Sequence, residues 1–162
     1  MIWGRGHVTG VVVAMLAVGL AVAGCGSSGE ADTRVASLTK EEFLKKANVI
    51  CARGTKEIGK RDRAAWNRYD PPPPKAVHSE AELNKVALAL LPPREKELRL
   101  IRAVGLPRGD EKYVEKILTA WAKGIEKGKE DPASLRAPGP EYAFYKSYSM
   151  GIDYGLVKCW LA

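Results

Sequence analysis

Apolar residues recur every three or four positions along four segments of the chain, which is the spacing of amphipathic α-helices. The segments begin near Thr39, Ser79, Asp110 and Glu141. Beyond the N-terminal region, no alternation of apolar and polar residues runs long enough to predict a strand. The pattern therefore predicts an all-α, small four-helix bundle-like domain over residues 38–162.

The first predicted helix carries a cap and one apolar arc. Thr39 and Glu42 have the spacing of a capping box, in which each side chain binds the backbone N–H of the other residue. On a helical wheel, one side of this helix collects Phe43, Leu44, Ala47, Ile50, Cys51, Gly54, Ile58 and Ala65. The helix must end before residues 71–74, four consecutive prolines that predict a stiff extended connector.

Proline and glycine punctuate the next two predicted helices. Ser79, followed by Glu82, predicts a second cap, and the two prolines at 92–93 predict a kink or break. The apolar stripe then resumes and ends at Gly105. The third helix begins near Asp110, and its apolar face comprises Tyr113, Val114, Ile117, Leu118, Trp121 and Ile125.

The last predicted helix is rich in aromatic side chains. Tyr145, Tyr148 and Ile152 fall near one line with Cys159, and helical spacing predicts that most of the late aromatics belong to the core. Because tyrosine and tryptophan also line pockets for apolar or sugar ligands, an aromatic-lined pocket is the alternative. Gly155 predicts a helix stop in the left-handed conformation.

The first 24 residues have the features of an export signal. Arg5 precedes an unbroken apolar run over residues 11–22, and small residues follow the run. A membrane span needs about 20 apolar residues, so this run is short for one. Ordinary secretion and an uncleaved anchor are nevertheless alternatives. Residues 26–32, rich in glycine and serine, predict a flexible tether.

Val22-Ala23-Gly24-Cys25 resembles a bacterial lipobox, the recognition site of lipoprotein signal peptidase. The resemblance implies cleavage before Cys25, a diacylglycerol on its sulfur and an acyl chain such as palmitate on its amine. Two or more acyl chains give stable anchoring, whereas one gives only marginal binding. The implied organisation is a signal peptide over 1–24, a lipidated cysteine with its tether over 25–37, and a helical domain held on the extracytoplasmic face of the cell membrane.

Two cysteines remain once Cys25 carries lipid. Cys51 lies on the apolar arc of the first helix, and Cys159 lies near the C-terminus. Because a pair of thiols outside the membrane is commonly oxidised, the predicted compartment favours one disulfide between them. Two unpaired buried cysteines are the alternative.

A sparse pattern along the domain combines Phe43-Leu44, Asn48 and Ile50-Cys51 with Leu91-Pro92-Pro93 and a terminal Tyr154-Gly155-Leu156 before Cys159. This pattern resembles a group of small actinobacterial lipoproteins of unknown function over about residues 38–160. The resemblance implies the same helix order and the pairing of Cys51 with Cys159. It implies no site residues.

The 162-residue chain has a net charge of +7, much of it on one face of the first helix. The arc opposite the apolar one contains Glu42 as its one acid and the bases Lys45, Lys46, Arg53, Lys56, Lys60 and Arg63. A merely solvated face explains such an arc, and so does attraction to anionic lipid headgroups or acidic wall polymer. Predicted export argues against nucleic acid as a partner.

Few residues suit catalysis or metal binding. His78 is the one histidine beyond the predicted signal, and no H-E-x-x-H, G-x-S-x-G or phosphate-loop motif occurs. We therefore expect no catalytic residue, metal or cofactor, and a binding or interaction role in the cell envelope. The alternatives are a carrier of a small apolar or sugar ligand in an aromatic-lined pocket and an unrecognised hydrolase.

Overall fold

The computed structural model describes residues 38–68 and 78–160, and these residues form α-helices joined by loops and 3-10 turns. The α-helices are α1 (Lys40–Trp66), α2 (Glu80–Ala89), α3 (Leu91–Val104), α4 (Glu111–Glu130) and α5 (Tyr145–Tyr154). The 3-10 turns are η1 (Pro132–Leu135), η2 (Gly139–Glu141) and η3 (Val157–Cys159). The all-α prediction is confirmed. The predicted signal peptide, Cys25, the tether and the prolines at 71–74 lie outside the described residues.

Both predicted capping boxes form. Thr39 Oγ1 accepts a hydrogen bond from the backbone N–H of Glu42 at 3.2 Å, and the Glu42 carboxylate accepts one from the N–H of Thr39 at 2.9 Å. Ser79 and Glu82 repeat this arrangement at the start of α2. Each cap satisfies backbone donors that a helix N-terminus would otherwise leave free, and so fixes where the helix begins.

The second predicted segment is broken rather than kinked. α2 ends at Ala89, Leu90 separates the two helices, and α3 begins at Leu91 with Pro92 and Pro93 in its first turn. Proline is tolerated there because the first turn of a helix has no intrahelical acceptor for its N–H groups. The four predicted segments therefore form five helices within the described residues.

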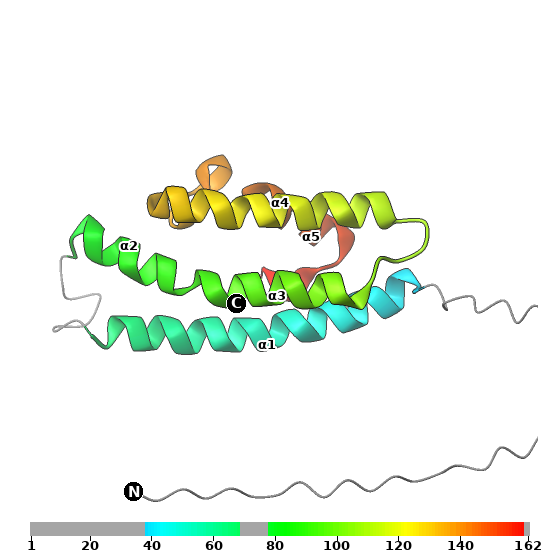
Figure 1. Ribbon diagram of the computed structural model, residues 1–162, viewed down its shortest axis with the longest axis horizontal. Helices are drawn as coiled ribbons and strands as arrows, with labels where there is room; N and C mark the ends of the chain where they lie inside the picture. The colour runs from blue at the N-terminus through cyan, green and yellow to red at the C-terminus, as the bar shows by residue number, and fades with distance from the viewer. Residues whose placement is uncertain (1–37, 69–77, 161–162) are drawn as a thin grey trace, which may run out of the picture. The chain divides into compact units, whose positions relative to one another are not determined.

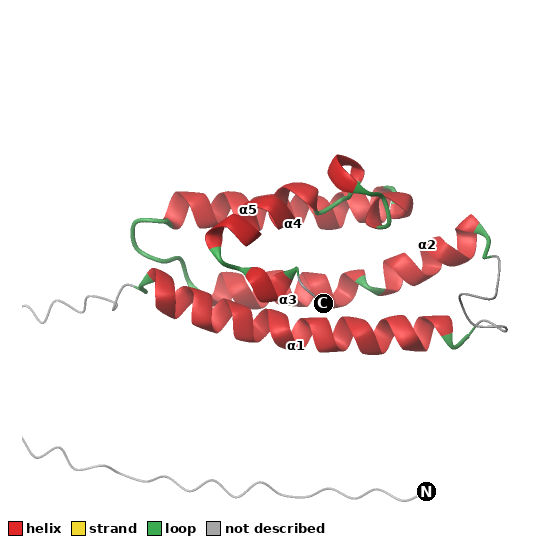
Figure 2. Cartoon of the chain, turned by 180° about the vertical axis from the view of Figure 1, so that it is seen from behind, coloured by secondary structure: helices red, strands yellow, loops and turns green. Residues whose placement is uncertain are grey.

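The helices pack in chain order around one apolar core. α3 lies between α1 and α4, α5 packs on α4, and η3 returns to α1 (Figures 1 and 2). Most of the fully buried side chains come from α1, α3, α4 and the C-terminal segment; the largest of them are Trp121, Phe43, Ile101, Ile117, Leu118 and Leu156. The arcs predicted to be apolar on the first and third helices are the ones that face this core, except that Tyr113 is half-exposed.

The prediction for the last helix is partly wrong. Tyr145 and Tyr148 are about 40% exposed, whereas Ser147, Gly151 and Tyr154 are buried. Small residues face inward because the Trp160 indole fills the adjoining space: a Cβ on residue 151 would lie 2.5 Å from its Nε1. The helix also begins at Tyr145 rather than near Glu141, since η2 occupies residues 139–141.

None of the helices in the described ranges combines the length and the apolar character needed to cross a bilayer.

Candidate functional site

The six basic residues predicted to share one arc are all exposed along α1: Lys45, Lys46, Arg53, Lys56, Lys60 and Arg63. The opposite arc packs into the core through Phe43, Ala47 and Cys51. Burial of the apolar arc fixes the rotation of the helix, so the basic arc is held outward along nearly the whole of α1. We call these six residues the basic face.

Within the described residues, no side chain of the basic face forms an ion pair. The neighbouring Arg61, which is not on that face, pairs with Glu57 at 3.2 Å, and Lys96 of α3 pairs with the same carboxylate at 3.7 Å. The acid within the arc, Glu42, is engaged in its cap, and the hydrogen bonds from Thr39 hold the pKa of Glu42 below its usual range. The charges of the basic face are therefore available to an anionic surface.

The surface of α1 is hollowed beside its middle. A shallow depression of about 510 Å³ is lined by Arg53, Lys56, Glu57, Lys60, Arg61 and Ala64. A smaller pocket of about 180 Å³ adjoins it between α1 and α3 and shares Arg53 and Glu57 with it; the other lining residues are Ile50, Gly54, Pro93, Lys96, Glu97 and Leu100. We call them the basic depression and the Glu97 pocket.

The Glu97 carboxylate is a buried charge that the sequence does not reveal. Its residue is 2% exposed, and Arg94 Nη1 donates to its Oε2 at 3.0 Å and to the carbonyl oxygen of Cys159 at 2.7 Å. Burial raises the pKa of Glu97 to about 6, although Arg94 counteracts part of that effect. Oε1 has no hydrogen-bond partner within the described residues.

Gly54 provides the room for this carboxylate. A Cβ on residue 54 would overlap the Glu97 side chain, so no larger residue fits there unless Glu97 moves. A glycine in the middle of a helix costs about 1 kcal/mol relative to alanine, which makes it a sequence signal for a close approach. Because Gly54 lies on the predicted apolar arc, the sequence indicates that another segment approaches α1 closely there. It does not indicate which residue approaches.

The C-terminal segment is bound to α1 next to this pocket. The predicted disulfide is confirmed: Cys51 is bonded to Cys159. One turn earlier on α1, Asn48 Nδ2 donates to the carbonyl of Gly155 and its Oδ1 accepts from the N–H of Lys158, both at 3.0 Å. Thr55 Oγ1 donates to the carbonyl of Lys158 at 3.3 Å. The covalent bond and these hydrogen bonds fix the segment that Arg94 also contacts.

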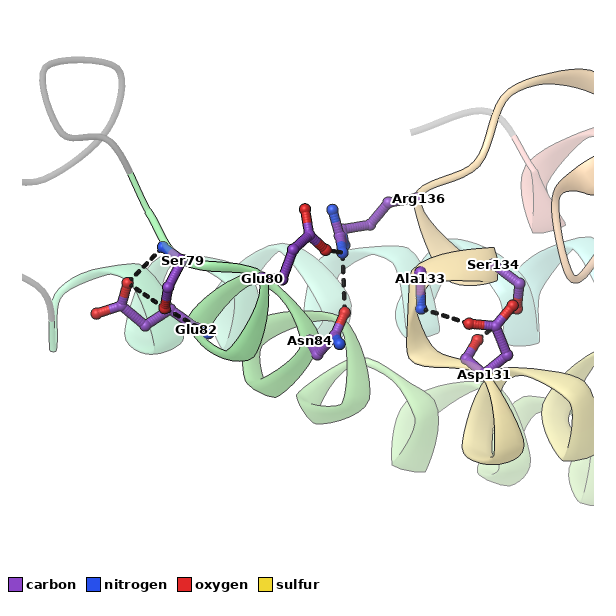
Figure 3. Close-up of polar contacts among 8 residues, drawn as sticks. All are labelled: Ser79, Glu80, Glu82, Asn84, Asp131, Ala133, Ser134 and Arg136. Carbon is purple, nitrogen blue, oxygen red and sulfur yellow. Dashed lines mark hydrogen bonds and ion pairs between the residues drawn. The ribbon is translucent and has the colours of Figure 1, made fainter.

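A second, aromatic-lined pocket of about 230 Å³ lies where α1, α2 and the segment before α5 meet. It is lined by Ile58, Asp62, Trp66, Leu83, Val86, Ala87, Leu90, Arg94, Leu135, Arg136, Tyr142 and Phe144. At its edge, Arg136 reaches across to α2, where Glu80 and Asn84 each accept a hydrogen bond at 2.8 Å (Figure 3). An aromatic-lined pocket was the alternative to a core position for the late aromatics, and the sequence did not indicate where such a pocket would lie.

An open groove of about 730 Å³ runs between α4 and α5. Its walls carry the lysines Lys112, Lys116, Lys123 and Lys146, together with Leu106, Glu111, Glu115, Thr119, Ala120 and Met150. It contains no aromatic side chain, so it lacks the character expected of the carrier pocket.

The described residues contain no group of three or more His, Cys, Asp or Glu side chains placed to hold a metal ion. No protein-family model matches the chain, and neither a curated protein nor a solved structure shows significant similarity to it.

Proposed function

We propose that the protein is a membrane-anchored, extracytoplasmic lipoprotein with a non-catalytic role, and that its helical domain docks on anionic surfaces of the cell envelope through the basic face of α1. The lipid anchor at Cys25 and the export signal rest on the lipobox-like sequence. The observation that supports docking is the exposure of six basic side chains without an ion pair in the described structure, on a helix whose opposite arc is buried.

The anchor and the basic face would act together. A lipid anchor keeps the domain within reach of anionic headgroups and acidic polymer, and each basic side chain near such a surface contributes up to about 1 kcal/mol. Salt reduces this contribution, because the Debye length is about 8 Å at physiological ionic strength. Six such groups on one rigid helix would orient the domain even though each contact is weak.

The test is binding of a soluble form that lacks residues 1–25 to vesicles containing phosphatidylglycerol, measured by co-sedimentation. We expect weak binding that fades with added salt and drops in a variant with Lys45, Arg53, Lys56 and Lys60 changed to Gln. The matched control changes the groove lysines Lys112, Lys116, Lys123 and Lys146 to Gln, which removes the same charge from another face. Circular dichroism checks that both variants remain folded.

The docking proposal fails if the α1 variant binds as well as the unchanged protein at low salt. It also fails if the groove variant loses binding to the same extent, because binding would then follow net charge rather than the basic face.

The aromatic-lined pocket favours carriage of a small amphipathic ligand as a second candidate function. Trp66, Tyr142 and Phe144 supply apolar rings, and Arg94 supplies a cation. Titration with the fluorescent aromatic anion anilinonaphthalene sulfonate should give saturable enhancement, and Leu83→Trp, which fills the pocket, should abolish it. Enhancement that is unchanged in Leu83→Trp would count against this function.

A further inference from the structure

We propose that the groove between α4 and α5 binds an acidic amphipathic α-helix of a partner protein. The apolar stripe of that helix would lie on the groove floor, and its carboxylates would pair with the lysines of both walls. This surface is separate from the basic face, so the inference does not depend on docking through α1.

The two helices that form the groove run antiparallel. α5 packs along α4 (Figure 2): Tyr154 Oη donates to Asp110 Oδ2 at 2.9 Å at one end, and Phe144 lies against Gly124 near the other. The groove has a volume of about 730 Å³, and its lining on α4 extends over residues 111–123. At 1.5 Å per residue, this lining is about 18 Å long, which is the length of roughly three helical turns. A helix therefore matches the groove better than a small molecule does.

The floor of the groove is apolar and accessible. Ala120 is 8% exposed, Met150 is half-buried, and Leu106 at one end of the groove is 37% exposed. The methylene groups of the lysine side chains extend this apolar surface, while their charged ends remain in water. Methionine adapts its shape to different partners, and an amphipathic helix binds a groove of this kind through its apolar stripe.

The walls carry an excess of positive charge. Lys112, Lys116, Lys123 and Lys146 are exposed, and none of them forms an ion pair in the described part of the chain. Of the two acids in the lining, Glu115 accepts a hydrogen bond from Thr119 at 3.3 Å and lies 4.0 Å from Arg102. The groove is therefore electrostatically complementary to acidic side chains.

The distribution of the lysines indicates which kind of anion fits. Lys112, Lys116 and Lys123 follow one side of α4 at intervals of about one and two turns, and Lys146 projects from α5 on the opposite wall. A phospholipid carries its charge at one end and would reach only part of this set, and an acidic wall polymer has no apolar stripe for the floor. A helix with acids on both flanks of an apolar stripe matches the floor and both walls.

The experiment places the full chain in nanodiscs of phosphatidylcholine and follows the methyl resonance of Met150, the one methionine of the described residues, by NMR. Met150→Leu assigns the signal. The probe is a synthetic peptide of about 14 residues, four helical turns, with leucine at helical spacing and glutamate on both flanks. This peptide should shift the Met150 resonance saturably.

Two control peptides separate charge from shape. A scrambled peptide of the same composition keeps the charge but loses the apolar stripe, and a peptide with glutamine in place of glutamate keeps the stripe but loses the charge. Each should bind about tenfold more weakly than the probe, because each lacks one of the two matched features. Equal binding of either control peptide would overturn the inference.

Matched variants of the protein locate the binding surface. Thr119→Glu adds an acid to the exposed lining of the groove and should weaken binding about tenfold by repulsion. The control Ala64→Glu adds the same charge to the basic depression on α1 and should leave binding unchanged. Circular dichroism checks that both variants are folded. Loss of binding in Ala64→Glu but not in Thr119→Glu would place the peptide on the basic face and refute the groove.

A last arm tests a lipid as the occupant. Nanodiscs in which phosphatidylglycerol replaces part of the phosphatidylcholine should leave the Met150 resonance unchanged in the absence of peptide. A shift caused by this lipid alone would identify the groove as a lipid site and overturn the inference, as would the absence of a shift with the acidic peptide. Either result would leave the docking proposal to its own test, because that test depends on the lysines and arginines of α1.

Discussion

Asn48 binds the turn that follows α5 with both ends of its side-chain amide: Nδ2 donates to the carbonyl of Gly155, 107 residues away in the chain, at 3.0 Å. Gly155 has a φ of +107°, a left-handed conformation that ends α5 and sends the chain back to α1. The amide Oδ1 accepts from the N–H of Lys158, so one side chain replaces the hydrogen bonds that the interrupted helix would have made.

We expect Asn48→Ala to lower the free energy of unfolding by about 1–3 kcal/mol, because it removes two hydrogen bonds at the closure of the fold. Asn48→Asp should lower the free energy of unfolding by less than Asn48→Ala does. The aspartate can still accept a hydrogen bond from the N–H of Lys158, although it cannot donate one to the carbonyl of Gly155. Urea unfolding followed by circular dichroism measures both. Val49→Ala, at the exposed neighbouring position, is the control and should be close to neutral.

The Cys51–Cys159 bond should contribute strongly to stability. It joins residues 108 positions apart, for which the loop-closure entropy corresponds to about 4–5 kcal/mol. The double variant with alanine at both positions should therefore unfold at much lower urea concentration, and reducing agent should shift the wild type in the same direction. Non-reducing peptide mapping of protein from the native envelope should recover the linked peptides. Free thiols on both residues there would contradict the pairing.

The features that could be predicted are those set by local sequence. Caps depend on residues three apart, as Thr39 and Glu42 show, and the break at Leu90 follows from the prolines after it. The basic face was also predictable, because the helical period alone determines which side chains lie opposite a buried arc.

The features that could not be predicted depend on contacts between distant segments. Glutamate is commonly a surface residue, so nothing at position 97 indicates burial; that depends on Gly54 making room and on Arg94 reaching the carboxylate. Likewise, Tyr148 continues an apolar-looking stripe, but Trp160 packs against Gly151 and takes the inward position. In both cases a tertiary contact overrides the local pattern.

The proposed anchor gives a direct prediction for the mature N-terminus. Mass spectrometry of protein isolated from the membrane fraction should find a chain that begins at Cys25 and carries diacylglycerol and an amide-linked acyl chain. Cys25→Ser should release the protein from the membrane fraction, because the basic face alone binds weakly. A mature chain with a different first residue, or one that retains Met1, would contradict this prediction.

Glu97 should make stability fall as the pH rises through weakly acidic values. Its pKa is raised from about 4.5 to about 6 in the folded chain, chiefly by burial, so between these values the folded state binds more protons than the unfolded state. Stability from this group is therefore fully present below pH 4.5 and is lost as the pH rises through about 6, in total about 2 kcal/mol. Arg94 on its own helix contacts the carboxylate, and the charged residues Arg53, Glu57 and Lys96 line the same pocket.

The measurement is urea unfolding of the wild type and Glu97→Gln at a series of pH values. Other carboxylates act in the opposite direction: cap hydrogen bonds lower the pKa of Glu42 and Glu82, which stabilises the fold as the pH rises through their range. These contributions are the same in the wild type and in Glu97→Gln, so they cancel when the free energies of unfolding of the two proteins are subtracted. The difference in the free energy of unfolding should thus shift by about 2 kcal/mol in favour of Gln between pH 4.5 and pH 7. A difference that does not vary with pH would contradict the raised pKa of Glu97 in the folded chain.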